Sequence, residues 1–234
     1  MPVAGFTVAD YLGLAFYASA WLAYYLMVER SDAGRRSLNR VMNSHRYQWM
    51  RGLSGRDNRI IDANINASLQ NGTAFFASTS LLAIGGSLTL LRSTDEVLTI
   101  FGEMPLGIAT SRLAWEMKVI GLTVIFVYAF FKFGWSYRLF NYAAILIGAV
   151  PNAGSPREEI EIAAWRAASM NTVAGRHFNR GQRAFFFALA YLGWFVSAYV
   201  LMLTTAAVLV VMSRRQFASD ALAALSRGPW PPPP

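Results

Sequence analysis

Long apolar stretches alternate with charged segments along this chain. A transmembrane helix needs about 20 consecutive, mostly apolar residues. Four stretches meet that length, at residues 8–28, 65–91, 113–135 and 184–212. The pattern therefore predicts an all-α integral membrane protein with about four transmembrane helices in a single helical domain, residues 1–213. Residues 214–234 form a tail that ends in prolines, which favour polyproline II over helix.

The charged segments between these stretches carry helical patterns of their own. After the first stretch, apolar residues recur at helical spacing and arginines occupy much of the other face. This predicts an amphipathic helix that either lies on the membrane surface or packs on the bundle. Residues 139–150 are too short to cross and are expected to extend the third span. Ser155, Pro156 and Glu158 have the spacing of a helix start, which predicts a cytoplasmic helix over residues 156–175.

Composition narrows the chemistry of this membrane protein. The chain has 234 residues, 55% of them hydrophobic, and contains no cysteine and only two histidines. Disulfides, thiolate metal sites and cysteine nucleophiles are therefore excluded. The sequence also lacks the glycine-rich phosphate loops and the zinc and serine-hydrolase motifs. We expect no metal and no cofactor, and a lipid-headgroup enzyme would lack a convincing nucleophile. The sequence leans away from an enzyme.

Positive charge gathers beside the apolar stretches. The net charge is +8, and its position predicts anionic lipid headgroups as partners rather than nucleic acid. Fifteen lysines and arginines lie in or beside the segments after the first and third spans, against six elsewhere. Because cytoplasmic loops carry the excess of these residues, we expect both termini on the non-cytoplasmic side of a bacterial inner membrane. Arg214 and Arg215 argue against that orientation.

A polar stripe begins the second span. Asp62, Asn66, Gln70 and Thr73 fall three or four residues apart, on one face of the predicted helix. A polar face exposed to lipid is costly, so this intramembrane stripe should face protein or water. Two interpretations stay open: hydrogen bonds between helices, or a path for a transported solute in a small oligomer.

Two arginine clusters are candidates for binding a phosphate or carboxylate headgroup, because guanidinium groups pair well with such anions. The clusters are His45, Arg46, Arg51 and Arg59 in the first cytoplasmic segment, and Arg176, His177, Arg180 and Arg183 in the second. Both are expected to converge beneath the bundle. The alternative is that these arginines only fix the orientation and solvate the surface.

Three strings are distinctive. They are Asn-Gly-Thr-Ala-Phe-Phe-Ala-Ser-Thr-Ser (71–80), the arginine-rich segment that contains Trp49, and Gly-Arg-His-Phe-Asn-Arg-Gly-Gln-Arg-Ala-Phe-Phe-Phe-Ala-Leu-Ala (175–190). In these strings the chain resembles the bacterial and plant membrane-protein family catalogued as domain of unknown function 599, over about residues 8–213. The resemblance implies the membrane fold and no particular activity.

The sequence therefore predicts a non-catalytic membrane protein. The expected role is an accessory or docking subunit of a larger complex, such as a respiratory or photosynthetic one, with a protein partner in the membrane. The alternative is a small oligomeric transporter or channel that uses the polar stripe.

Overall fold

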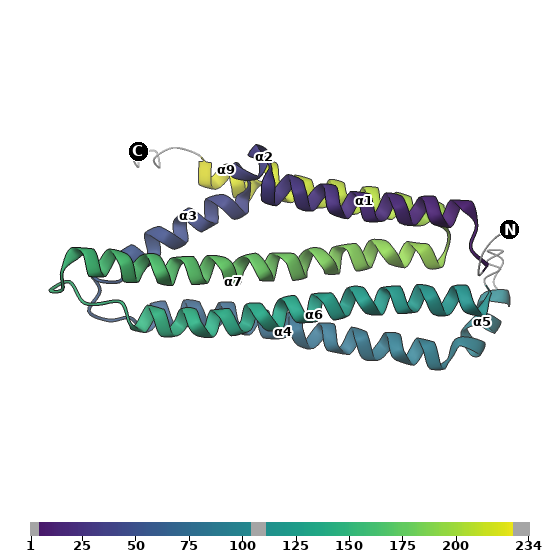
Figure 1. Ribbon diagram of the computed structural model, residues 1–234, viewed down its shortest axis with the longest axis horizontal. Coiled ribbons are helices and arrows are strands. Elements are labelled where there is room, and N and C mark those ends of the chain that lie inside the picture. Colours follow the sequence, from purple (N-terminus) through teal and green to yellow (C-terminus); the bar gives the residue numbers. More distant parts are fainter. Residues whose placement is uncertain (1–4, 104–110, 227–234) are drawn as a thin grey trace, which may run out of the picture.

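The computed structural model describes residues 5–103 and 111–226 and is a bundle of long helices (Figure 1). Helices make up 87% of it, and the described residues contain no strand. The all-α prediction is confirmed. The elements are α1 (Val8–Arg30), α2 (Asp32–Arg35), α3 (Leu38–Arg51), α4 (Ile60–Arg92), α5 (Thr94–Glu103), α6 (Arg112–Gly148), α7 (Arg157–Leu192), the 3-10 turn η2 (Gly193–Phe195), α8 (Ala198–Phe217) and α9 (Asp220–Ser226).

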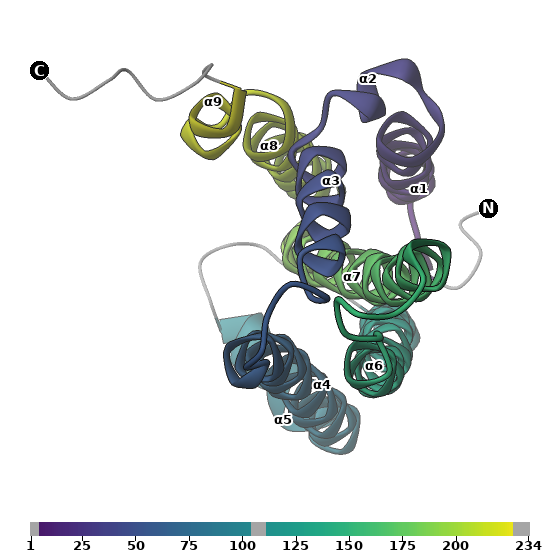
Figure 2. The same cartoon turned by 90° about the vertical axis from the view of Figure 1, so that its left-hand side faces the viewer.

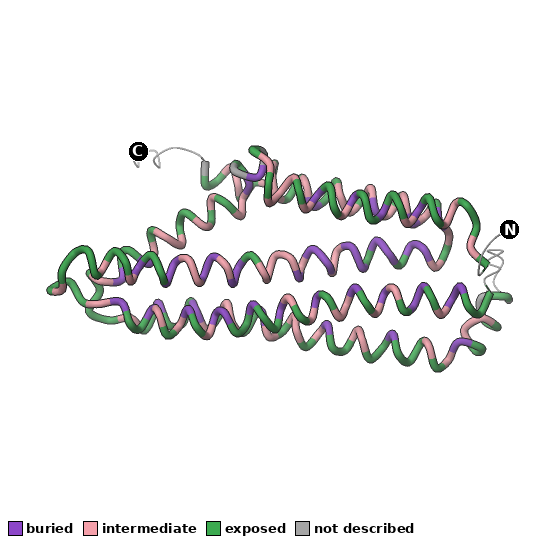
Figure 3. Tube along the Cα trace, in the orientation of Figure 1, coloured by how far each residue is buried: buried purple, intermediate pink, exposed green. Residues whose placement is uncertain are grey.

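Four helical segments are long and apolar enough to cross a membrane: Val8–Arg30, Ile60–Arg92, Arg112–Gly148 and Ala198–Leu225. Their outward faces are apolar, and many of these residues are exposed (Figure 3). Leu82 and Leu203, for example, are 76% and 70% exposed. Faces of this kind are stable against lipid rather than water. The chain is thus a multi-pass membrane protein, as predicted.

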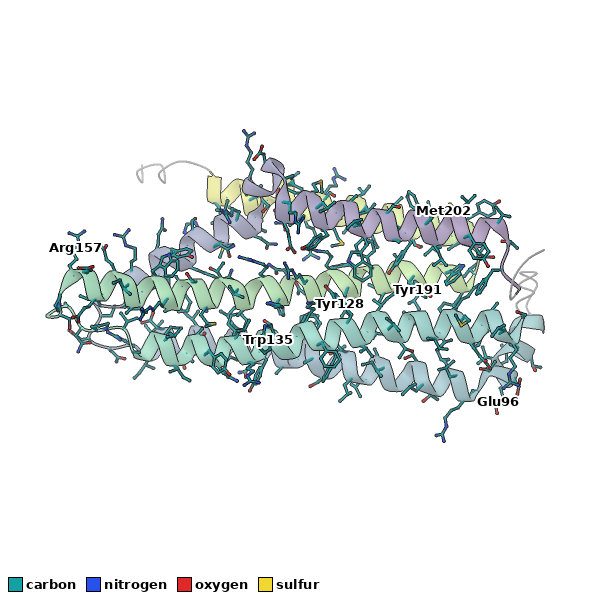
Figure 4. The ribbon with its side chains drawn as sticks, in the orientation of Figure 1. Glu96, Tyr128, Trp135, Arg157, Tyr191 and Met202 are labelled. Carbon is teal, nitrogen blue, oxygen red and sulfur yellow. The ribbon has the colours of Figure 1, made fainter. Side chains whose placement is uncertain are left out.

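Three helices are much longer than a membrane is thick. Helices α4, α6 and α7 have 33, 37 and 36 residues, which at 1.5 Å per residue is roughly 50 to 55 Å, against about 30 Å of hydrocarbon. The shorter α1 and α8 flank only one half of this length (Figure 1). We call that part the membrane half and the remainder, with α3 along it, the extension. Glu96 and Arg157 mark the two ends of the molecule (Figure 4).

Two polar layers bracket the membrane half. At one end Trp194 Nε1 donates to Asp10 Oδ1 at 2.7 Å, and Lys118 Nζ donates to the carbonyl of Trp194 at 2.8 Å. At the other end Glu29 pairs with Arg180. Nineteen residues of α1 separate Asp10 from Glu29, a rise of about 28 Å that matches the hydrocarbon thickness. We therefore take the level of Glu29 as one boundary of the hydrocarbon.

The fourth predicted span, 184–212, is wrong, because the chain reverses within it. Helix α7 ends at Leu192, η2 follows, and α8 begins after Ser197, whose hydroxyl accepts from the Val200 N–H at 3.2 Å. A side chain at Gly193 would come within 2.9 Å of the Val200 carbonyl, so the close turn needs glycine there. Sequence patterning missed the turn because its other residues are mostly apolar.

The other helix predictions fare better. Residues 139–150 mostly continue α6, as expected, and α7 begins one residue after Pro156. It then runs on past residue 175 to Leu192 instead of stopping. The predicted amphipathic helix is α3, and it packs on α7, with the Tyr47 and Ser169 hydroxyls 3.1 Å apart. Packing on the bundle is thus the interpretation that the contacts favour.

Helices α1 and α8 run in the same direction. A side chain at Gly13 would come within 3.3 Å of the Ala198 carbonyl, and the Tyr24 hydroxyl donates to the Met212 carbonyl at 3.3 Å. The start of α1 and the end of α8 therefore lie at opposite ends of the membrane half. The prediction that both termini share one side did not count the second half of α7, which runs between these two ends, and the side on which each terminus lies stays a prediction. The prolines of the tail, residues 227–234, lie outside the described residues.

Candidate functional site

A cavity of about 240 Å³ lies at the boundary between the membrane half and the extension. Seen along the bundle, α3 lies between the ends of α1 and α8 and over α7 (Figure 2). We call this space the arginine cavity. Its charged and amide side chains are Glu29, Asn39, Arg40, Asn43, Arg176, Asn179 and Arg183.

Helical spacing and one sharp turn bring these residues together. Arg176, Asn179 and Arg183 are three and four residues apart, so they share one face of α7. A side chain at Gly34, in α2, would collide with the Val28 carbonyl. The chain can therefore fold back closely on the end of α1, and this turn carries the first turns of α3 over α7.

The walls of the arginine cavity carry excess positive charge. Glu29 accepts from Arg180 Nε at 2.9 Å and from Arg183 Nη2 at 3.3 Å. Among the described residues, neither the Arg40 nor the Arg176 guanidinium has a hydrogen bond or an ion pair. Three arginines thus share the walls with one glutamate, and Arg180 already compensates that glutamate. The electrostatics favour an anion.

Neutral donors stand beside the arginines. Asn43 Oδ1 accepts from Arg46 Nη1 at 2.7 Å, which leaves the amide nitrogen of Asn43 as a donor. A neighbouring opening is bordered by Arg40, Asn43, Thr172 and Arg176. There the buried Thr172 hydroxyl has no hydrogen-bond partner. Guanidinium, amide and hydroxyl groups together suit phosphate or carboxylate oxygens.

The second predicted cluster divides between two faces of α7. Arg176 and Arg183 line the cavity, and Arg180 holds Glu29 beside it. His177 instead faces Trp135 on α6, with the ring centroids 6.5 Å apart. Burial, followed by the nearby Lys132, Arg180 and Arg176 cations, lowers the pKa of His177.

The first predicted cluster does not line the arginine cavity. His45 is exposed beside Gln48, and Arg51 pairs with Glu161 at 3.6 Å on the surface. Arg46 packs its guanidinium against α7, so that a side chain at Gly175 would come within 2.8 Å of it. Burial lowers the pKa of Arg46. The two clusters meet only at this point, next to Arg176.

Arg59 closes the C-terminus of α6. Its guanidinium donates to the carbonyls of Val150 at 2.6 Å and Ile147 at 3.3 Å. The Ile147 carbonyl also accepts from the Val150 N–H at 3.4 Å, whereas the Val150 carbonyl, just past the end of α6, takes its donor from Arg59. Its role in the described structure is to join α4 to α6.

Asn39, Arg40 and Asn43 are site residues that sequence reasoning missed. They lie within one turn at the start of α3, where Asn39 and Asn43 are four residues apart. That spacing was a usable signal for donors on one helical face. The sequence did not show that α2 would fold this face beneath the end of α1.

The polar stripe lies in the extension, beyond the level of Glu29. Asn66 Nδ2 donates to the Phe140 carbonyl at 3.2 Å, and Gln70 Nε2 donates to Asn141 Oδ1 at 2.6 Å. Helix α4 reaches the level of Arg180 only near Phe76, whose ring stacks on Phe133 beside Gly181.

Asp62 and Thr73, at the two ends of the stripe, also find protein partners. The buried Asp62 accepts from Trp49 Nε1 at 2.6 Å and pairs with Arg56. The Thr73 hydroxyl donates to the Leu69 carbonyl at 2.7 Å. The Thr73 bond stays within α4. The contacts of Asp62, Asn66 and Gln70 reach other helices and favour hydrogen bonds between helices, one of the two interpretations that the sequence left open. Over the described ranges, no three histidine or carboxylate side chains are grouped to hold a metal ion.

Comparison with known proteins gives one match. A family model described as "Protein of unknown function, DUF599" matches residues 12–221. No curated protein and no solved structure matches the chain.

Proposed function

The chain belongs to the DUF599 family of proteins of unknown function, and from that premise we propose that it is a non-catalytic membrane protein that holds an anionic group in the arginine cavity. The group is a phosphate or a carboxylate at the membrane boundary. The observation that carries the proposal is the pair Arg40 and Arg176, which face one cavity without a partner among the described residues.

An anion would relieve a specific electrostatic imbalance. Arg40, Arg176 and Arg183 converge from α3 and α7, and like charges that approach one another repel. Arg183 is only 5% exposed, so water screens it poorly. A phosphate or carboxylate between these guanidinium groups would gain charge-assisted hydrogen bonds, and such bonds are about twice as strong as neutral ones.

We place the Glu29 end of the membrane half in the cytoplasm, in a bacterial inner membrane. Of the lysines and arginines in the described residues, Arg92, Arg112 and Lys118 lie toward the opposite end. The others gather at the Glu29 level or in the extension. With α7 counted as a passage, Arg214 and Arg215 join the arginine-rich side, which removes the objection that they raised to the predicted orientation. The start of α1 then lies outside and the end of α8 inside.

A second role, docking on a larger membrane complex, is favoured by one surface of the extension. Ile60, Ile61 and Ile65 on the first turns of α4 are 64%, 71% and 43% exposed. They lie beyond the hydrocarbon layer, where lipid does not cover them, and exposed apolar groups of this kind often mark protein contacts.

The docking role is tested with Ile61→Lys, with Ala63→Lys, at an exposed position on another face of the same helix, as a control. Complexes from native membranes would be weighed in mild detergent. We expect a partner at constant ratio that the Ile61 variant loses and the control keeps. Recovery of the chain without any partner would contradict docking. We do not carry the transport alternative further, since the polar stripe has protein partners and lies outside the hydrocarbon.

Anion binding is tested by thermal unfolding of the full chain in neutral detergent. The probes are glycerol 3-phosphate and phosphatidylglycerol, with phosphatidylcholine for comparison. Either anionic probe should raise the Tm, and the shift should disappear in the double variant Arg40→Gln/Arg176→Gln. Arg166→Gln makes the same type of charge change at an exposed position of α7 outside the cavity and should keep the shift. No shift with either anionic probe, or an equal shift in the double variant, would overturn the proposal.

A further inference from the structure

A second cavity, of about 220 Å³, continues the arginine cavity toward the membrane. Val28, Asn39, Asn179 and Arg183 line both cavities. Because they share these four residues, the two cavities adjoin. Together they extend from beneath α3 to between α1, α7 and α8.

The wall changes from polar to apolar along this space. On the membrane side it is formed by Tyr24, Leu38, Phe186 and Met212. Tyr24 precedes Glu29 by five residues of α1, so it lies about 7 Å deeper than the charged layer. The second cavity therefore reaches the depth at which the acyl chains of a bilayer begin.

Polar groups also line the second cavity. The Arg215 guanidinium lies 5.4 Å from the centre of the Phe186 ring. The buried Gln216 Nε2 has no hydrogen-bond partner among the described residues, and both side chains line the second cavity. A buried amide donor without a partner is costly, and an oxygen-rich headgroup would satisfy it.

Together these features describe a space with a cationic end and an apolar end. We infer that its occupant is an anionic phospholipid. The inference rests on the proposed anion site and names its ligand class. The phosphate lies among Arg40, Arg176 and Arg183, and the start of one acyl chain lies along Phe186 and Met212. A free phosphate ester would fill only the cationic end.

Binding affinities distinguish a lipid phosphate from a free phosphate ester. Titrations of the full chain in neutral detergent would compare glycerol 3-phosphate with phosphatidylglycerol, which carries a related headgroup phosphate. The lipid should bind with a dissociation constant at least about tenfold lower, the effect of burying about two methylene groups. Equal affinities would overturn the lipid assignment and leave the anion site standing. No binding of either probe would overturn both.

A substitution at the apolar end sharpens the test. Leu38→Trp should fill part of the second cavity, weaken phosphatidylglycerol and leave glycerol 3-phosphate unchanged. Leu203→Trp, on the exposed face of α8, is the matched control and should change neither. Weakening of both probes by the Leu38 variant, or of neither, would contradict the assignment.

Crosslinking gives a readout that does not depend on any variant folding. Phosphatidylglycerol with a photoreactive group near the start of one acyl chain would be added to the full chain. The crosslinked peptides should contain residue 38, 186 or 212, and excess unlabelled phosphatidylglycerol should suppress the product. Crosslinks confined to the exposed outer faces, such as that of Leu203, would overturn the inference.

Discussion

The arginines of the extension and those of the arginine cavity look alike in sequence but differ in what they contact. Arg51 pairs with Glu161, and Arg59 donates to the carbonyls at the end of α6. Arg40 and Arg176 have no such partner among the described residues and face one cavity. The comparison teaches that arginine content alone does not mark the candidate site, whereas missing partners do. Substitution should therefore cost stability in the first group and binding in the second.

The largest expected effect on stability comes from the hydrogen bonds that hold α3 and α4 together in the extension. Asp62→Ala should lower the free energy of unfolding by about 3 kcal/mol, because a buried carboxylate that holds Trp49 and Arg56 is lost. Denaturant unfolding in mild detergent measures the change. Asp57→Ala, at an exposed position nearby, is the control. Equal stability of the two variants would mean that the contacts of Asp62 do not stabilise the extension.

Arg59→Ala should have the next largest effect. It leaves helix-end carbonyls of α6 without their donor, and we expect a loss of about 1 to 3 kcal/mol. Arg51→Ala removes only an exposed ion pair and should cost less than about 1 kcal/mol. The same unfolding measurement compares the two. A larger loss from the Arg51 variant would reverse our assignment of structural roles.

The double variant Arg40→Gln/Arg176→Gln should behave in the opposite way. Both side chains are exposed, so replacing them removes no buried packing. The free energy of unfolding without ligand should therefore change by less than about 0.5 kcal/mol. Unfolding curves recorded without lipid test this. A loss of unfolding free energy as large as that of Arg59→Ala would mean that the two arginines stabilise the fold. They would then not differ from the arginines of the extension.

The smallest effect concerns His177, the member of the second cluster that faces away from the cavity. Burial, with Lys132, Arg180 and Arg176 nearby, lowers its pKa below the usual 6.5. Below about pH 6.5 the unfolded chain binds a proton that the folded chain does not, so stability should fall as the pH decreases. Unfolding at pH 8 and pH 5.5 should show a smaller pH dependence in His177→Gln than in the wild type. An equal pH dependence of stability in both proteins would show that His177 is not its source.

Sequence patterning predicted the elements better than their meeting points. The predicted spans in α1, α4 and α6 and the helical character of α3 follow from hydrophobic periodicity and length. The turn at Gly193 was hidden, because Trp194, Phe195 and Val196 are as apolar as a membrane span. Missing it merged the end of α7 with α8, so the prediction for the two termini did not count the second half of α7.

Half of the candidate site was likewise within reach of sequence reasoning. Arg176 and Arg183 were predicted from their charge and from the affinity of guanidinium groups for anions. Asn39 and Arg40 were not, because their place depends on the fold-back at Gly34. The polar stripe was identified residue by residue, but its depth depends on how far α4 extends past the membrane, and the apolar residues around the stripe gave no sign of this.

Native mass spectrometry of the full chain, released gently from membranes into neutral detergent, tests the central claim most directly. The account predicts one retained anionic phospholipid per chain in the wild type and in Arg166→Gln, and none in Arg40→Gln/Arg176→Gln. A folded wild-type chain that retains no lipid, or a double variant that retains as much as the wild type, would contradict the claim that the arginine cavity holds a lipid phosphate.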